Sequence, residues 1–440
     1  MPSPPRHALV VGAGLAGLAA AWRLSRAGSR VTVLECGARI GGRLAGERVE
    51  GYPLEPVPGL IGPGDTRLLA WISELGLRDA MLPAKPVVTA WAGRDGLRDL
   101  EIRSLRDVAR LPGVRRWHAW RLVRLPRLAA RYGGALALGA IAEAEQIDDR
   151  SLGDFARLYF GASVLEHWMA PAVCAGSLGD PEQMSRVQFL QHYRAHGLGR
   201  VGVLQAALGD LLERAASGVA VEAHCRVDRI EAAAGGFRAT AADGRAFEGD
   251  AVAIAVPAPI AAQIADPVLV TPERAYLADV RYAPALAVAA ALCRPLVPRA
   301  RFAAIPERAS WLGAVLVEPG LRGGRIPAAG GLALLRATGS FAAAHPETPS
   351  ETLEKELLAE VDRVWPGFGR SVEFTRVFRQ RYGAARFDVG AYRALARFER
   401  VQADRRAAGR RLAFAGDYRV HPSLEGMVRS GERAAAELIG

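Results

Sequence analysis

Apolar runs and helical spacing alternate at the start of the chain. Residues 8–11 and 31–34 are short apolar runs of the kind that forms strands. Between them, apolar side chains recur at helical spacing from residue 15 to 24, and Gly28 ends that segment. Strand, glycine turn, helix and strand together predict a parallel βαβ unit.

A different pattern occupies the middle of the chain. From residue 225 to 250 apolar and polar residues alternate, with turns at Gly235 and at Asp243-Gly244, which predicts short antiparallel strands. A continuous apolar run at 251–256 then predicts a buried strand. Near the C-terminus, residues 412–415 predict one more strand, before a helix from about Gly426.

Two long segments remain, at 76–199 and 259–404. The first has a helical pattern, and the second carries several short apolar runs that suit a sheet. The chain has 440 residues, which is too long for one ordinary core, so we expect two domains.

Charge and cysteine content narrow the range of partners. The net charge is +11, and with Lys85 and Lys355 as the only lysines nearly all basic residues are arginines. A basic surface favours anionic partners, but no nucleic-acid motif is present, so we expect no nucleic acid. The cysteines lack CxxC and zinc spacing, which predicts free thiols in a reducing cytoplasm and no metal site; they are Cys36, Cys174, Cys225 and Cys293.

One basic segment bears on membranes. No apolar run reaches the ~18 residues of a membrane span, and the N-terminus has no signal core, so a membrane contact would be peripheral. Residues 114–133 combine six arginines with Trp117 and Trp120 and are interrupted by Pro126. This composition fits an interfacial helix at the inner membrane face, or a solvated helix whose tryptophans pack inward.

The first turn carries a dinucleotide motif. Gly12, Gly14 and Gly17 form G-x-G-x-x-G between a predicted strand and a predicted helix. The glycines permit a sharp turn, a close approach to a pyrophosphate and close helix packing, and the helix N-terminus attracts phosphate. Glu35, 18 residues after Gly17, is placed to accept hydrogen bonds from a ribose diol.

The stretch "ECGARIGGR" separates FAD from NAD. Its Glu-x-x-x-Arg-x-Gly-Gly-Arg pattern resembles the fingerprint of the FAD-dependent amine oxidase, phytoene desaturase and protoporphyrinogen oxidase superfamily. The resemblance implies that Gly41 and Gly42 pass over the pyrophosphate and flavin, and that Arg39 and Arg43 help to neutralise the phosphates. Guanidinium groups suit that role because they pair with phosphate oxygens.

The C-terminal residues resemble the same superfamily. The order of strand, Gly-Asp, loop and "EG" helix implies that Gly416 and Asp417 contact the pyrophosphate and the ribityl chain. It also implies that Gly426 and Met427 lie at the flavin edge, where the helix N-terminus stabilises negative charge. No cysteine lies in this loop, so we expect non-covalent FAD.

The resemblance covers nearly the whole chain. In the predicted meander, Val227 matches the residue whose backbone holds the adenine. The expected fold is α/β, with a Rossmann-like FAD-binding domain of the glutathione-reductase type with a β-meander, and a mixed α+β substrate domain. Both expected domains are discontinuous. The expected FAD-binding domain comprises residues 1–75, 200–258 and 405–440. The expected substrate domain comprises residues 76–199 and 259–404.

A second glycine motif leaves an alternative open. Gly197 to Gly202 again reads G-x-G-x-x-G, and Glu222 follows about 20 residues later, as in an NAD(P)H site. The preceding segment is a poor candidate for a buried strand, and the superfamily has a glycine-rich helix entry here without a nicotinamide.

The resemblance also bears on the chemistry. Amine-oxidising members use a lysine in the strand after the meander, and neither lysine of this chain lies there. We therefore predict an FAD-dependent oxidoreductase that moves hydride from a C–H bond of a small apolar, polycyclic or isoprenoid-like substrate to flavin N5. Oxygen or a quinone would be the electron acceptor. A flavin amine oxidase and a non-redox flavin-dependent isomerase are the alternatives.

Three residues are candidates for the flavin-facing wall. Val57 stands where the superfamily usually has a glycine near the isoalloxazine ring, which puts the usual substrates in doubt and keeps the isomerase alternative open. Tyr282 and Tyr382 could line the substrate cavity, although a packing role is the simpler interpretation of each. No histidine or carboxylate pair stands out as an acid or base.

Overall fold

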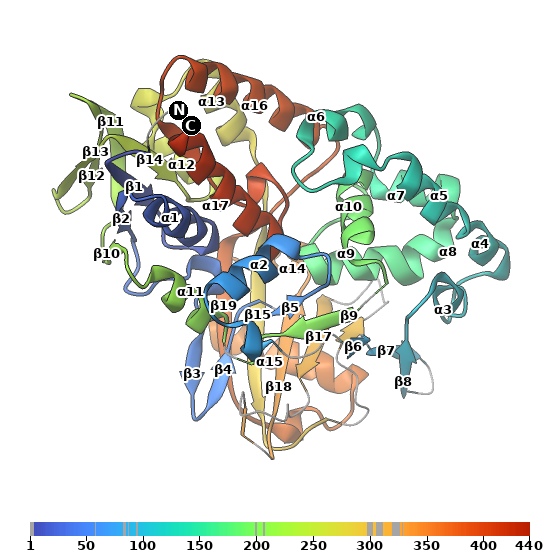
Figure 1. Cartoon of the computed structure of the whole chain (residues 1–440). Helices are drawn as coiled ribbons and strands as arrows, with labels where there is room; N and C mark the ends of the chain where they lie inside the picture. Colours follow the sequence, from blue (N-terminus) through green and yellow to red (C-terminus); the bar gives the residue numbers. More distant parts are fainter. Residues whose placement is uncertain are drawn as a thin grey trace.

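The computed structural model describes residues 4–57, 59–81, 85–86, 88–93, 96–198, 200–205, 207–296, 302–304, 311–318, 326–327 and 329–440. Two large sheets organise this part of the chain, and a group of helices lies beside them (Figure 1).

The first sheet is parallel and has the strand order β10-β2-β1-β14-β20. At its centre, Val10 of β1 is paired with Val33 of β2 and with Ala253 of β14. The two strands predicted near the N-terminus are therefore neighbours, as expected for a βαβ unit. The strands are His7–Val11 (β1), Arg30–Leu34 (β2), Ala220–Glu222 (β10), Ala251–Ile254 (β14) and Leu412–Phe414 (β20).

Each face of this sheet is covered by a different layer. Ala8 and Val10 pack with helices on one face, whereas Leu9 and Val11 pack with the meander on the other. Strands buried on both faces read as continuous apolar runs, which is why the sequence revealed them. The helices are Leu15–Arg26 (α1), Thr66–Glu74 (α2), Leu208–Ala216 (α11) and Leu424–Ile439 (α17).

The meander is antiparallel and has the order β11-β12-β13, as predicted. Its strands are Val227–Ala233 (β11), Gly236–Ala241 (β12) and Ala246–Gly249 (β13). Helices, a parallel sheet and a meander form three layers, which confirms the expected Rossmann-like α/β class.

The second sheet has seven strands in the order β19-β15-β18-β17-β16-β7-β8. Helices α14 (Gly339–Ala344) and α15 (Ser350–Val364) pack on one face, and β4 (Tyr52–Leu54) and α9 (Ala170–Ser177) pack on the other. The strands are Val88–Gly93 (β7), Gly96–Glu101 (β8), Tyr282–Leu292 (β15), Phe302–Ala304 (β16), Leu312–Glu318 (β17), Gly331–Ala337 (β18) and Val372–Ala385 (β19).

The segment 76–199 is thus less uniform than its helical pattern suggested, because β7 and β8 extend the second sheet. Two small sheets complete the strands. One pairs Glu47–Val49 (β3) with Tyr52–Leu54 (β4), and the other contains Leu60–Ile61 (β5), Lys85–Pro86 (β6) and Arg200–Val203 (β9).

The remainder of that segment is helical and forms its own core (Figure 1). Pro126 does not break the basic segment at its own position: the helix is interrupted between Arg121 and Arg124, and Pro126 lies in the first turn of α5, where its missing N–H removes no helical bond. The helices are Leu105–Val108 (α3), Arg116–Arg121 (α4), Arg124–Arg131 (α5), Ile141–Ala144 (α6), Leu152–Tyr159 (α7), Ala162–Val164 (α8), Ala170–Ser177 (α9) and Arg186–His196 (α10).

Three helices of the segment 259–404 join the core on the meander side of the first sheet. They are α12 (Ala258–Ile264), α13 (Thr271–Asp279) and α16 (Ala391–Ala407), and α16 also contacts α6. Among the residues that the structure describes, every helix is too short or too polar to cross a bilayer.

Candidate functional site

The first glycine turn has the shape that its motif requires. Gly12 follows β1 with φ of +102°, and its N–H donates to the Leu34 carbonyl at 2.8 Å. A Cβ on Gly17 would stand 1.9 Å from the Gly12 carbonyl oxygen, so only glycine lets α1 approach the turn. A Cβ on Gly14, by contrast, would have no protein atom within 4 Å. The turn is therefore closed on its packed side and open at Gly14.

Glu35 lies beside this turn at the end of β2. It is buried, and its two oxygens accept one backbone N–H each, from Ala13 and from Gly37, both at 2.8 Å. A carboxylate oxygen has two acceptor sites. The oxygen that accepts from Gly37 also accepts the Cys36 thiol at 3.4 Å, so the oxygen that accepts from Ala13 keeps one site for a further donor. This arrangement orients the carboxylate and leaves capacity for a ribose diol.

The turn of the "ECGARIGGR" stretch lies directly on the glycine turn. The Gly41 N–H donates to the Ala13 carbonyl at 2.8 Å, and Gly14 and Gly41 form a parallel bridge. Gly41 and Gly42 both have positive φ, and a Cβ on Gly42 would lie 3.4 Å from the Gly14 Cα. Two glycine turns that are separate in sequence therefore approach each other backbone to backbone.

The two arginines of that stretch have different surroundings. Arg39 is exposed and donates to the Gly46 carbonyl at 3.1 Å. Arg43 is mostly buried; it forms an ion pair with Asp417 at 2.5 Å and donates to the Met427 sulfur at 3.8 Å. The structure thus brings Arg43, Asp417 and Met427 together, whereas Arg39 lies outside this group.

Asp417 joins three distant segments. Besides Arg43, it accepts the Ala385 N–H at 2.8 Å and the Tyr282 hydroxyl at 3.4 Å. Burial and then the nearby Asp417 raise the pKa of Tyr282 well above its usual value, so this phenol stays protonated. Tyr382 meets Tyr282 edge to face, with ring centroids 5.3 Å apart. Both predicted tyrosines therefore lie beside the Asp417 loop.

The last helix begins next to this loop. Ser423 caps α17 by accepting the Gly426 N–H at 3.1 Å, so the helix starts at Leu424, two residues before the predicted start. A Cβ on Gly426 would lie 2.2 Å from the His421 carbonyl oxygen, which explains the glycine. Met427 packs against the core of the first sheet.

Glu425 is a residue of this helix that the sequence did not single out. It is fully buried, and its oxygens accept the N–H groups of Arg67 (3.1 Å) and Leu68 (2.7 Å) at the start of α2. It thereby ties the N-termini of α2 and α17 together. The "EG" pair that marked the helix was the available signal.

Two valines complete the predicted set. Val227 begins β11 and is buried, close to where the Cys225 N–H donates to the Glu35 carbonyl at 2.7 Å. The adenine candidate and the ribose candidate are therefore neighbours. Val57 is partly buried and packs against the core of the first sheet, and nearby Glu55 accepts the N–H of Leu208 at the start of α11.

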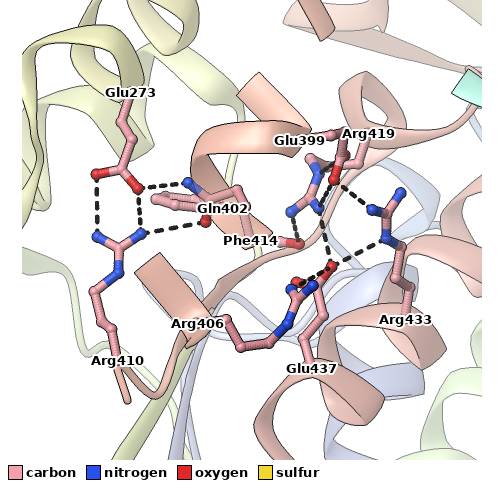
Figure 2. Close-up of polar contacts among 9 residues, drawn as sticks. All are labelled: Glu273, Glu399, Gln402, Arg406, Arg410, Phe414, Arg419, Arg433 and Glu437. Carbon is pink, nitrogen blue, oxygen red and sulfur yellow. Dashed lines mark hydrogen bonds and ion pairs between the residues drawn. The ribbon is translucent and has the colours of Figure 1, made fainter. Parts of the chain in front are cut away.

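A charged network that the sequence did not predict holds the Asp417 loop in place (Figure 2). Arg419 is 1% exposed; it donates to both oxygens of Glu399, at 2.9 and 3.0 Å, and to the Phe414 carbonyl at 2.8 Å. It also pairs with Glu437 at 3.3 Å. Burial acts against ionisation of Glu437, but Arg419, Arg433 and Arg406 prevail and lower its pKa.

A second group in Figure 2 fastens the C-terminal half of α16 to Glu273 of α13. The Arg410 guanidinium binds the buried Glu273 carboxylate from two nitrogens, one of them at 3.0 Å, and Gln402 donates to the same carboxylate. The arginines are spread along the chain, and the sequence did not indicate which of them would be buried in ion pairs.

Histidines form a further group that sequence reasoning missed. The rings of His192 and His196 lie 4.7 Å apart, and His196 is 3.4 Å from Asp65. His421 is buried, and burial together with His196 lowers its pKa to about 4, against a weaker effect of the Gln188 backbone. Burial, His196 and His421 lower the pKa of His192 to about 3 although its side chain is exposed.

The second glycine motif does not form a dinucleotide turn. Gly197 ends helix α10, and Gly202 lies within β9, while Gly199 is outside the described residues. The order is helix, glycine, strand, which is the reverse of the order that places a phosphate at a helix N-terminus. The NAD(P)H alternative is therefore excluded at this position.

FAD fits the residues that the structure brings together. Gly14 opens onto free space, and no side chain caps α1 in the described part of the chain, which leaves N–H groups at its first turn for phosphate oxygens. Glu35 can accept from the ribose, Val227 lies near it, and the N-terminus of α17 lies beside Arg43. Within the described residues, no group of His, Cys, Asp and Glu is arranged to hold a metal ion.

Comparisons with known proteins agree with this fit. The model of a family described as flavin containing amine oxidoreductase matches residues 15–439. A 200-residue stretch is 33% identical to the putative flavin-containing monoamine oxidase AofH of Mycobacterium tuberculosis, covering 43% of this chain and 40% of that protein. The chain thus spans less than half the length of this curated relative.

Solved structures show the same fold over almost the whole chain. Wild-type putrescine oxidase bound to putrescine has a TM-score of 0.78 at 19% identity and covers 99% of both chains. A putative protoporphyrinogen oxidase from Exiguobacterium sp. has a TM-score of 0.74 at 18% identity and covers 98% of both.

Proposed function

The chain belongs to the family of flavin-containing amine oxidoreductases, and from this premise we propose that it dehydrogenates a small apolar substrate. It is an FAD-dependent oxidoreductase whose FAD is bound without a covalent link. The proposed substrate class is a polycyclic or isoprenoid-like carbon skeleton, with oxygen or a quinone as electron acceptor.

The roles of the individual residues are part of the proposal. Gly12 and Gly17 would shape the turn, Gly14 would admit the pyrophosphate, and Glu35 would orient the ribose. Bound FAD supplies the hydride acceptor. The residues of the chain hold and orient it: the loop of Asp417 is fixed by Arg43, Ala385 and Tyr282, and α17 directs its N-terminus to the same place.

The single observation that carries the substrate class is the composition of β15. Ala287, Ala289 and Ala291 share one face of this strand and pack with Tyr52, Leu54 and Ala175. β15 contains no lysine, although the superfamily resemblance places the lysine of amine-oxidising members in this strand. Lys355 lies on α15, exposed and paired with Glu351 at 2.8 Å. An apolar wall without an amine-directed group favours a carbon substrate.

Arg336 adds one positive charge at the end of this face. It is buried opposite Ala287 and donates to the Ala175 carbonyl at 2.5 Å. Burial lowers its pKa to about 10, which indicates that little negative charge compensates it. We therefore include in the proposed class apolar substrates that carry one acidic group.

We also propose that the chain forms two discontinuous domains. The FAD-binding domain would comprise 1–75, 200–258 and 405–440, and the substrate domain 76–199 and 259–404. Helices α13 and α16 of the second part would connect it to the first sheet, where their side chains pack. We place the protein in the cytoplasm, in peripheral contact with the inner membrane face, because apolar substrates dissolve in bilayers.

Anaerobic reduction of the bound flavin tests this proposal. The yellow holoenzyme is mixed under argon with terpenoid and polycyclic hydrocarbons, with apolar carboxylic acids and their methyl esters, and with primary and secondary amines. We expect loss of the visible flavin absorbance with a member of the first two groups and not with amines. Mass spectrometry of small molecules that co-purify with the protein guides the choice of compounds.

The alternatives give different outcomes. Bleaching by amines, followed by peroxide release in air, would identify an amine oxidase. Binding of an apolar compound that changes its double-bond position without bleaching would identify an isomerase. Val57 is the residue that favours this second candidate, since it replaces the glycine expected beside the isoalloxazine ring.

A further inference from the structure

The exposed hydrophobic side chains are concentrated at one place. Of the five large hydrophobic residues that are exposed in the described part of the chain, four belong to the helical group: Trp117 (78%), Trp120 (79%), Val123 (56%) and Leu158 (56%). The Arg121 side chain donates to the Leu158 carbonyl, so α7 and α4 meet here. We call these four residues the tryptophan surface. Figure 1 shows α4 at the outer edge of the helical group, away from both sheets.

The sequence left open whether the tryptophans of residues 114–133 pack inward or face outward, and the structure answers this question. The tryptophans do not pack inward: neither belongs to the core of the helical group, which is made by Leu122, Leu125 and other residues. Two tryptophans exposed to this degree, three residues apart on one helix, form an unusual surface for a monomer in water.

Arginines flank the two tryptophans along the chain. Between Val108 and Ala142 the sequence has no acidic residue and seven arginines. All but Arg121 are exposed, and within the described residues none of the seven forms an ion pair. They are Arg110, Arg115, Arg116, Arg121, Arg124, Arg127 and Arg131. Elsewhere, exposed arginines such as Arg229 and Arg238 pair with nearby glutamates.

We propose that the tryptophan surface docks the protein on an anionic lipid bilayer. Tryptophan prefers the level of the lipid headgroups, and arginines beside it attract anionic lipid. The charge also argues against a second copy of the chain on the same surface, because seven unpaired positive charges would face seven more. This inference rests on the membrane contact included in the proposed function and names the surface that makes it.

Vesicle flotation of the FAD-loaded protein tests the proposal. We expect the protein to float with phosphatidylcholine vesicles that contain phosphatidylglycerol at low salt, and much less with phosphatidylcholine alone or at high salt, because salt screens the attraction. W117S/W120S should float less at every lipid composition. R116Q/R124Q/R127Q should reduce the partition coefficient on the order of a hundredfold, since each arginine contributes about a factor of five near an anionic surface.

The matched control carries the same change in net charge elsewhere. R229Q/R238Q/R397Q replaces three exposed arginines outside the tryptophan surface and should float nearly as well as the wild type. Flotation needs no turnover, and flavin absorbance and thermal midpoint check each variant for folding. A failure here therefore leaves the redox proposal standing.

Three outcomes would overturn the proposal. The first is no flotation with anionic vesicles at low salt. The second is an equal loss in the control triple variant, which would mean a diffuse charge effect. The third is a dimer in solution that becomes a monomer in W117S/W120S, which would assign the surface to a second copy of the chain.

Discussion

The two glycines Gly14 and Gly17 differ in the atoms that a Cβ added to each would contact. Gly14 and Gly17 belong to the same motif and the same helix start, yet one faces open space and the other the Gly12 carbonyl. The dinucleotide motif has glycine at both positions, but the physical reason for glycine differs between them. The close packing of α1 on the turn requires Gly17, whereas Gly14 leaves free space that the proposed function assigns to the ligand.

This difference gives a prediction at the residue scale. In Gly14→Ala the new Cβ has ordinary backbone angles and no clash, so the apoprotein should unfold at the wild-type temperature while FAD binds at least tenfold more weakly. Gly17→Ala should instead lower the apoprotein stability by several kcal/mol, on the scale of overpacking against backbone. Thermal unfolding of apoprotein and FAD titration by flavin fluorescence measure both.

Gly209→Ala is the matched control. Gly209 also faces open space, but on α11, so this change should leave FAD affinity unchanged and should not lower stability, because alanine favours a helix more than glycine does. Normal FAD affinity in Gly14→Ala would show that the pyrophosphate does not approach this turn.

At the scale of elements, the site depends on how strands and helices are fastened to one another. The Gly416-Asp417 pair lies on a short loop between β20 and α17, and such a loop needs external support. Arg419 provides it by linking the loop to Glu399 on α16 and to Glu437 on α17. The loop is therefore held in place by two long helices, α16 and α17.

Removing Arg419 tests this support. Arg419→Met would leave Glu399 and Glu437 buried with fewer positive partners, which should cost about 3–5 kcal/mol of unfolding free energy. The same variant should release FAD faster, because the Asp417 loop loses its anchor. Urea denaturation of the holoenzyme and the FAD dissociation rate are the measurements. Arg397→Met changes an exposed arginine on the same helix α16 and should leave both nearly unchanged.

For the molecule as a whole, the buried His421 ties stability to pH. The pKa of His421 is lowered to about 4, below the unfolded value of 6.5, so the unfolded chain binds more protons between these values. The unfolding free energy should consequently fall as pH drops from 6.5 to 4, by up to roughly 1.4 kcal/mol per unit. His192 acts in the same direction, and the raised pKa of Asp65 acts against it.

Unfolding midpoints measured from pH 7.5 to 4 in His421→Asn and wild type test this dependence. The wild type should lose stability more steeply below pH 6.5, while the variant should show a shallower slope whatever its stability at pH 7. His224→Asn is the control, because His224 is exposed and asparagine tolerates its positive φ of 50°. Parallel slopes in His421→Asn and wild type would contradict the assignment.

The sequence by itself determined the parallel strands, the glycine turn, the meander and the last strand and helix. Each is local: a buried strand reads as an apolar run, and a tight turn needs glycine. The resemblance of "ECGARIGGR" then identified the family, because that spacing is specific to one cofactor.

Only the tertiary structure decided which distant residues meet. The pairing of Arg43 with Asp417, the burial of Arg419 and the cluster of His192, His196 and His421 join residues far apart in the chain, and no local pattern distinguishes such arginines or histidines from exposed ones. The sequence also did not determine that Trp117 and Trp120 point outward. Composition does not say which face of a helix packs against the core, and only the tertiary packing decides it.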